Sequence, residues 1–314
     1  MPSDSATRSS PGPGGLQLAD APLVVPAAGV FTVRAGRERG LTRKELRAPG
    51  LDRPLHGVRS TTPVESIHAR CRAVLAIAPE GTVISHITAA RLHDLWLPTV
   101  DDDTIHVIRP AGTSRIRRPG ITDHEGLNRR ALGVVHGIPV TSAADTWADL
   151  NGTLTAANLV CVGDGIANIA GGVDALAAAL AWRVARRAPG VSALRLVHAR
   201  VRTGSRSRLE SMGRIVLVNG GLPEPELNYV VKDAAGEWLA EVDLAWPDWR
   251  TCVELQSKKF HKGREVFDES RRQLLTDAGW FVGFMFPETT FTELKARAFV
   301  EHMRGQLTLR GWTG

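Results

Sequence analysis

The chain has 314 residues, a formal net charge of +6 at pH 7 and a sequence pI near 9.7. This length exceeds one typical domain and predicts two or three units, each large enough to bury its own core. The net positive charge is compatible with polyanionic partners, whose binding would weaken as the salt concentration rises.

The cysteines and the N-terminal segment exclude several classes of protein. Cys71, Cys161 and Cys252 lie far apart and form no C-x-x-C pair, so neither a zinc knuckle nor a disulfide framework is predicted. The start, MPSDSATRSSPGPGG, lacks the apolar run of a signal peptide, and the later run VDALAAALAW is too short to span a bilayer. We expect a cytoplasmic protein without a membrane partner, with residues 1–28 as a disordered tail.

The segment 29–62 is predicted to form a winged-helix-like DNA-binding unit. In VFTVRAGRERGLTRKELRAPGLDRPLHGVRS, a first helix ends at Gly40 and a second begins at Thr42, where Glu45 completes a capping box. A proline–glycine pair ends the second helix, and LHGVRS supplies a short strand of a wing. Basic side chains on this helix and beside the wing lie where such a unit meets phosphates and base edges: Arg43, Lys44, Arg47, Arg53 and Arg59.

The segment 63–172 alternates helices with short strands, as expected of an α+β domain. PVESIHARCRAVLAIA has helical spacing, GTVISHITAARLHDLWLP contains a helix stopped at Pro98, and TIHVIRP alternates as a strand. HGIPVTSAADTWADL adds a strand and a capped helix. The turn AGTSRIRRPG is either a DNA-facing hairpin or a solvated turn, and it carries Arg115, Arg117 and Arg118.

The N-terminal half contains no clear sequence motif for a nucleotide cofactor or a metal ion. The glycines of TAANLVCVGDGIANIAGG do not have the spacing of the dinucleotide fingerprint G-x-G-x-x-G, so a helix and no nucleotide cofactor are expected. His86 and His93 lack the H-E-x-x-H pattern and are interpreted as packing or surface groups. Alanine-rich helices broken at Pro189 form a connector over 173–203. The whole chain lacks a Walker loop and a G-x-S-x-G elbow.

The segment 204–314 is predicted to be an α/β domain. SRSRLESMGRIVLVNGG forms a helix ending at Gly220, followed by two strands around KDAAGE and a third in RTCVELQS. REVFDESRRQLLTDAG is a helix, WFVGFMF is a fourth strand, and a closing helix spans about residues 292–304. This order predicts a mixed four-stranded sheet flanked by helices.

Acidic side chains on two of these strands are predicted to share one face. Because side chains alternate along a strand, Val242 and Leu244 are expected in the core while Asp243 points the other way. By the same alternation, Glu254 and Gln256 point away from the core. The alternative is that these are ordinary solvated positions on a half-exposed sheet.

Such a face suits magnesium. Neighbouring strands lie about 4.8 Å apart, so Asp243 and Glu254 are expected within reach of one cation. Glu210, early in the preceding helix, is a candidate third carboxylate. Carboxylates, water and substrate phosphate are the ligands that Mg²⁺ prefers, and the ion would polarise a water for attack on a phosphodiester.

The C-terminal segment resembles a known nuclease superfamily. The motifs SRLES, GLPEPELNY, EVDLAW, VELQ and FDESRRQLLTDAGW resemble the PD-(D/E)XK superfamily, in particular its Vsr-like (very-short-patch-repair-like) endonuclease domains, over about residues 205–304. The resemblance implies a restriction-endonuclease-like fold, a magnesium ion and DNA as substrate. In such relatives the third strand usually continues as E-Y-D-G followed by a histidine, whereas this chain has ELQSKKFH.

This chain departs from the family motif at a position that carries a charged catalytic residue in the relatives. Gln256 stands where the relatives have an acid or, in the wider superfamily, a lysine, and Lys258 has the strand parity to supply the missing positive charge. His261 matches the family histidine, which could relay a proton. Arg271 and Arg272 lie where the family has a basic helix that could touch phosphate. The alternatives are a solvated turn for the lysine, a packing or surface role for the histidine and an exposed helix face for the arginines.

The N-terminal half resembles another family. The basic helix, together with SHITAARLHDLWLP, TIHVIRPAGTSRIRRPG and HGIPVTSAADTWADL, is similar to AbiEi-type antitoxins over about residues 30–170. That family implies a winged helix, repression of its own operon and a cognate toxin as partner. We therefore expect a DNA-binding protein with a magnesium-dependent endonuclease-like domain. The alternatives are a non-catalytic transcriptional regulator with a degenerate nuclease fold and an antitoxin that acts through protein contacts alone.

Overall fold

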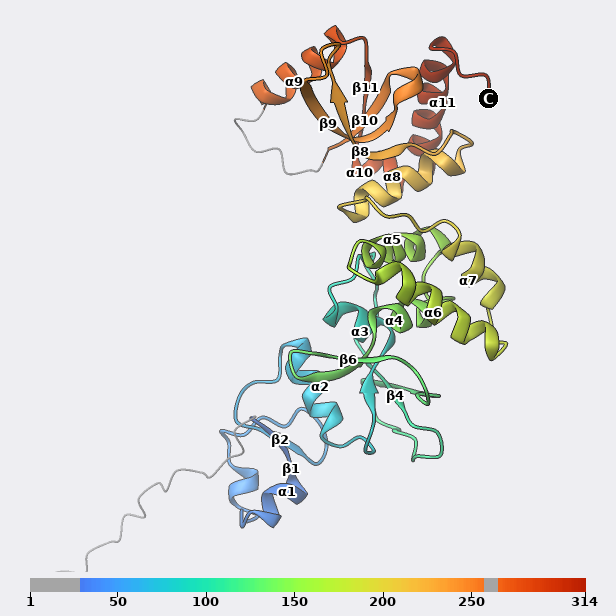
Figure 1. Ribbon diagram of the computed structural model, residues 1–314. Coiled ribbons are helices and arrows are strands. Elements are labelled where there is room, and N and C mark those ends of the chain that lie inside the picture. Colours follow the sequence, from blue (N-terminus) through green and yellow to red (C-terminus); the bar gives the residue numbers. More distant parts are fainter. Residues whose placement is uncertain (1–28, 257–264) are drawn as a thin grey trace, which may run out of the picture. The chain divides into compact units, whose positions relative to one another are not determined.

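The computed structural model describes residues 29–256 and 265–314 (Figure 1). The chain divides at Val64 and Glu65 into two compact units. Within the described ranges, no helix is long and apolar enough to cross a membrane.

The first unit is a two-stranded sheet with one short helix and one helical turn. Its elements are β1 (Val30–Thr32), α1 (Val33–Glu38), a 3-10 turn (Glu45–Arg47) and β2 (Val58–Ser60). β1 pairs antiparallel with β2, so its residues form a strand and not the start of the predicted helix. The Thr32 hydroxyl accepts the Ala35 N–H at 3.0 Å and thereby begins α1.

The predicted second helix is only a 3-10 turn. The capping box is confirmed, because Thr42 N–H donates to the Glu45 carboxylate at 2.7 Å and Glu45 N–H donates to the Thr42 hydroxyl at 3.2 Å. The prediction of an α-helix is nevertheless wrong. Ala48 precedes Pro49, whose ring disfavours helical geometry at the preceding residue, and Ala48 is extended with φ −52° and ψ 141°.

The second unit begins with a five-stranded sheet in the order β5-β4-β3-β7-β6. The predicted elements α2 (Ile67–Leu75), β4 (Ile105–Arg109), β7 (Ile138–Thr141) and α4 (Ala143–Asp149) are confirmed. The predicted third helix forms as α3 (His86–Leu92), but it ends at Leu92 and not at Pro98. Three further strands, which were not predicted, complete the sheet: β3 (Val83–Ile84), β5 (Ile121–Glu125) and β6 (Leu132–Val135). Because β4 and β5 are parallel, the basic loop between them is a crossover and not a hairpin.

Three helices follow the sheet: α5 (Ala156–Ala167), α6 (Gly172–Ala185) and α7 (Val191–His198). The glycines in the middle of α5 serve packing, as expected for a helix. A Cβ atom on Gly163 would lie 2.6 Å from the Val201 side chain, and one on Gly165 would lie 3.0 Å from the Trp96 ring.

The C-terminal part of the second unit is the predicted mixed sheet with helices on both faces (Figure 1). Its strands have the order β11-β10-β9-β8, with β10 and β11 parallel and the other pairs antiparallel. Its elements are α8 (Arg208–Asn219), β8 (Glu226–Lys232), β9 (Trp238–Trp246), a 3-10 turn (Pro247–Trp249), β10 (Thr251–Leu255), α9 (Glu265–Asp277), β11 (Phe281–Met285), α10 (Pro287–Phe291) and α11 (Glu293–Leu309).

Helix α8 contributes to two hydrophobic cores. Met212 and Ile215 pack in the core that contains α5, whereas Leu217 packs with β9, β10 and α11. Between them, Arg214 places its guanidinium 2.9 Å from the Asp164 carboxylate of α5. The two side chains are 1% and 0% exposed, so this is a fully buried ion pair.

Candidate functional site

Asp243 lies at a position of β9 that is not paired with β8. The β8–β9 pairing skips Asn228 and Asp243, and Asn228 has a left-handed φ of +47°. Val242 packs with the core beneath α9, whereas Leu244 packs with the core beneath α8 and α11. The prediction that these two residues point to the same side is therefore wrong.

Where the backbone pairing of β9 and β10 stops, Asp243 contacts β10 through its side chain. Its Oδ2 accepts the Leu255 N–H at 2.7 Å. Burial raises the pKa of Asp243, the Leu255 hydrogen bond lowers it, and the nearby charge of Glu210 raises it further. The net effect is a raised pKa, which eases protonation of this carboxylate.

Glu254 lies opposite Asp243. Val253 pairs with Leu244, and continuing that register by one residue places Glu254 across from Asp243. Glu254 is 9% exposed, and its Oε1 lies 2.8 Å from Arg271 Nη2 of α9. The charge of Arg271 also lowers the pKa of Asp243, so one guanidinium acts on both carboxylates.

Glu210 is held in a different role. Its carboxylate accepts the Arg206 N–H at 2.7 Å, the Ser207 hydroxyl at 2.8 Å and the Asn228 side-chain amide at 3.0 Å. Ser207 in turn caps α8 through the Glu210 N–H at 3.2 Å. Over residues 29–256 and 265–314, the three carboxylates do not form a group with all ligand atoms within 4.8 Å.

A small pocket lies beside the carboxylate pair. Its lining includes Glu254, Gln256, Arg271 and Arg272, and its apolar wall comes from α9 and β11. The Gln256 N–H donates to the Met285 carbonyl at 2.9 Å, which continues the β10–β11 ladder to this position. The other two predicted catalytic residues, Lys258 and His261, lie outside the described residues.

The carboxylates at this site suit magnesium, but one of them is already paired with an arginine. Asp243 and Glu254 supply carboxylate oxygens, and Mg²⁺ is commonly held by one or two carboxylates together with water and substrate phosphate. The Arg271 ion pair already engages one of these carboxylates, so a divalent cation would have to share Glu254 with a guanidinium.

The basic residues of the first unit divide into exposed and anchored groups. Arg43, Lys44 and Arg47 are exposed. Arg59 is half-buried and donates to the Leu46 carbonyl at 2.7 Å. Burial and the charges of Arg53 and Arg47 lower the pKa of Arg59, so the three arginines lie close enough to repel one another.

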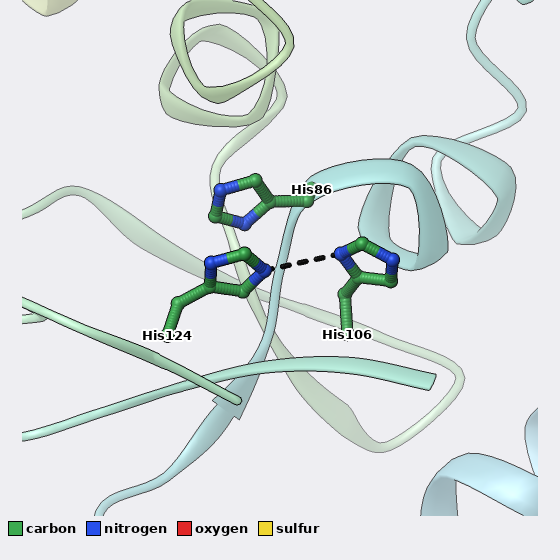
Figure 2. A group of neighbouring side chains, drawn as sticks. All are labelled: His86, His106 and His124. Atoms are coloured by element: carbon green, nitrogen blue, oxygen red, sulfur yellow. Dashed lines mark hydrogen bonds between the residues drawn. The ribbon is translucent and has the colours of Figure 1, made fainter. Parts of the chain in front are cut away.

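The structure also brings together three histidines that the sequence did not single out as a group (Figure 2). His86 begins α3, His106 lies on β4 and His124 lies on β5. Each offers one nitrogen, and these atoms all lie within 4.8 Å of one another. His86 stacks on the His124 ring, with centroids 3.6 Å apart, and His93 lies 2.8 Å from the Thr141 carbonyl, as packing residues would.

The comparisons with known proteins define no family for this chain. No family model matches it. It is similar to uncharacterized proteins of Mycobacterium tuberculosis, one from strain CDC 1551 / Oshkosh and one from strain ATCC 25618 / H37Rv. Each is 38% identical over 78 residues, which cover 24% of this chain and 28% of the relative. The matched part thus spans about a quarter of each protein, and the relatives carry no named activity.

Proposed function

We propose that this chain binds DNA and that its C-terminal part hydrolyses DNA phosphodiester bonds slowly, in a magnesium-dependent reaction. The observation that carries the proposal is the opposed pair Asp243 and Glu254, at the end of the β9–β10 ladder and beside a pocket lined by basic residues of α9. The order α8, three strands, α9 and a parallel β11 supports a restriction-endonuclease-like fold.

The residues of the pocket have distinct roles in this proposal. Asp243 and Glu254 would hold Mg²⁺, which when bound neutralises charge on the phosphate and lowers the pKa of a coordinated water. Arg272 lines the same pocket and suits a phosphate oxygen. Gln256 can orient a water by hydrogen bonding, but it supplies no positive charge to the transition state.

Two features predict that cleavage is slow. Gln256 lacks the charge that a lysine would bring to the reacting phosphate. Arg271 competes with a cation for Glu254, since its guanidinium lies 2.8 Å from the carboxylate oxygen. Metal affinity and the chemical step are therefore both weakened.

A second candidate is a non-catalytic DNA-binding regulator, and the Arg271–Glu254 ion pair favours it. In this role Arg271 replaces the metal as the partner of the carboxylates, and the basic cluster of the first unit supplies the affinity for DNA. The resemblance to AbiEi-type antitoxins adds a cognate toxin as the expected protein partner.

Plasmid nicking by the full chain separates these candidates. Supercoiled DNA is incubated with the protein in Mg²⁺ or Mn²⁺, and Asp243→Asn and Glu254→Gln are compared with the exposed control Glu226→Gln. The endonuclease proposal expects nicking by the wild type and the control and its loss in the other two variants. If the wild type binds duplex DNA and leaves it uncut, the regulator is the function.

A further inference from the structure

The histidine cluster is organised by hydrogen bonds around one shared proton position. His106 Nδ1 lies 3.1 Å from His124 Nε2, and the dashed line in Figure 2 marks this bond. On its other side, His106 Nε2 lies 2.8 Å from the Asp102 carboxylate. A carboxylate accepts only, so His106 donates its Nε2–H to Asp102 and a neutral ring turns the Nδ1 lone pair towards His124.

Asp102 is itself fixed in place. Its Oδ1 accepts the Thr104 N–H at 2.9 Å and the Thr104 hydroxyl at 2.8 Å, which leaves Oδ2 for His106. A histidine whose outer nitrogen donates to a carboxylate is the usual arrangement around metal-ligating imidazoles.

The nitrogen separation suits a small ion. With metal–nitrogen bonds of about 2.0–2.1 Å, two ligands of a tetrahedral site lie roughly 3.3 Å apart. The His106–His124 separation of 3.1 Å is close to that value, so one ion can replace the proton that the two nitrogens share.

The third ring, His86, is not oriented for ligation in this structure. The His86 and His124 rings are stacked, with centroids 3.6 Å apart and planes inclined by 10°. Lone pairs lie in the ring planes, so stacked rings cannot both point at one ion and His86 must turn. Its Nδ1 is 3.0 Å from the Ser85 hydroxyl and 3.8 Å from Asp149, whose carboxylate Arg130 and Arg183 hold.

The three rings are also chemically suited to a transition-metal ion. Neutral imidazole is the ligating form, and it suits zinc, copper, iron and nickel and not magnesium.

We propose that His86, His106 and His124 form a binding site for a first-row divalent transition metal, with Zn²⁺ as the reference ion and Asp102 as a positioning residue. Three protein ligands leave a coordination position for water or substrate. The site lies on α3, β4 and β5 and uses none of the carboxylates assigned to Mg²⁺ above.

The test is calorimetric titration of the tag-free full chain with Zn²⁺ and, separately, with Mg²⁺. The wild type should bind Zn²⁺ at this site, and excess Mg²⁺ should not compete. His124→Ala, on the edge strand β5, should weaken Zn²⁺ binding more than Asp102→Asn, for which a loss of roughly 10–100-fold is expected. Bound Co²⁺ should give a visible absorption spectrum that His124→Ala abolishes.

His68→Ala is the matched control, because His68 packs edge-on against His136 in the same unit, with ring centroids 4.9 Å apart. This variant should keep the wild-type affinity and the Co²⁺ spectrum. Circular dichroism of the metal-free variants checks that each is folded. The proposal is overturned if folded His124→Ala binds Zn²⁺ as tightly as the wild type, if His68→Ala loses binding equally, or if the wild type binds no Zn²⁺.

Discussion

Replacing Arg214 by methionine should destabilise the second unit strongly. Arg214 Nη2 lies 2.9 Å from Asp164 Oδ2, and both side chains are buried. Methionine fills most of the space of the aliphatic stem but leaves the Asp164 carboxylate without its cation. The carboxylate keeps the hydrogen bond from the Arg202 N–H at 2.8 Å, which does not replace the lost cation.

The expected loss is about 3–5 kcal/mol, because a buried charge that loses its partner keeps its desolvation penalty. The second contact of Arg214, to Glu224 at 2.6 Å, adds less because Glu224 is 38% exposed. At about 2–4 °C per kcal/mol for a unit of this size, the melting temperature should fall by roughly 6–20 °C.

The loss should also depend on pH. Burial raises the pKa of Asp164 even with Arg214 beside it, and removal of the cation raises this pKa further. A folded-state pKa above the unfolded value costs stability at neutral pH, and this cost disappears as the pH falls through the folded-state pKa towards the unfolded one. The difference between variant and wild type should therefore shrink in acid.

Urea unfolding followed by tryptophan fluorescence is a suitable assay. All eight tryptophans lie beyond Val64, so the signal reports the second unit alone. Trp147 is buried in the core with α5, and Trp246 is buried in the core beneath α11, so the probes lie on both sides of the ion pair.

The double variant Arg214→Met with Asp164→Asn provides the control. Asparagine keeps an acceptor for the Arg202 N–H but carries no charge, so the double variant should recover most of the loss. A loss below about 1 kcal/mol in Arg214→Met, a loss independent of pH, or no recovery in the double variant would refute the reasoning.

Three further predictions concern DNA, catalysis and packing. Replacing Arg43, Lys44 and Arg47 together by alanine should weaken duplex binding and reduce its salt slope by roughly one unit per lost phosphate contact; an unchanged slope in a fluorescence titration contradicts the DNA-binding assignment. Gln256→Lys should raise the rate of Mg²⁺-dependent plasmid nicking; an equal or lower rate argues against its assignment to the lysine position. Gly213→Val should cost about 1–3 kcal/mol in urea unfolding, because a Cβ there lies 2.9 Å from the Leu255 side chain; an unchanged midpoint contradicts the packing.

Local signals in the sequence located most elements. The box of Thr42 and Glu45 and the cap of α4 by Ser142 involve residues within one helical turn, so spacing alone predicts them. Pro49 also predicts where the second helical segment ends, but the sequence does not show that this segment is a 3-10 turn of three residues.

Non-local geometry accounts for what the sequence did not reveal. His106 and His124 meet because β4 and β5 are parallel and in a particular register, which no spacing along the chain specifies. The unpaired position of Asp243 lies opposite Asn228, whose left-handed backbone belongs to the neighbouring strand. The pairing of Arg271 with Glu254 likewise joins a helix and a strand that pack only in the folded chain.

The shared helix α8 restricts how this chain could be recombined in evolution. A cut just before Arg208 would give a C-terminal fragment that exposes Met212 and Ile215 and carries Arg214 without Asp164. If the segment from α8 onwards were transferred to another protein, it would therefore need to bring α5 with it or acquire substitutions at these positions. Recombination breakpoints between α5 and α8 should consequently be selected against, whereas one near Val64 and Glu65 would leave both units whole.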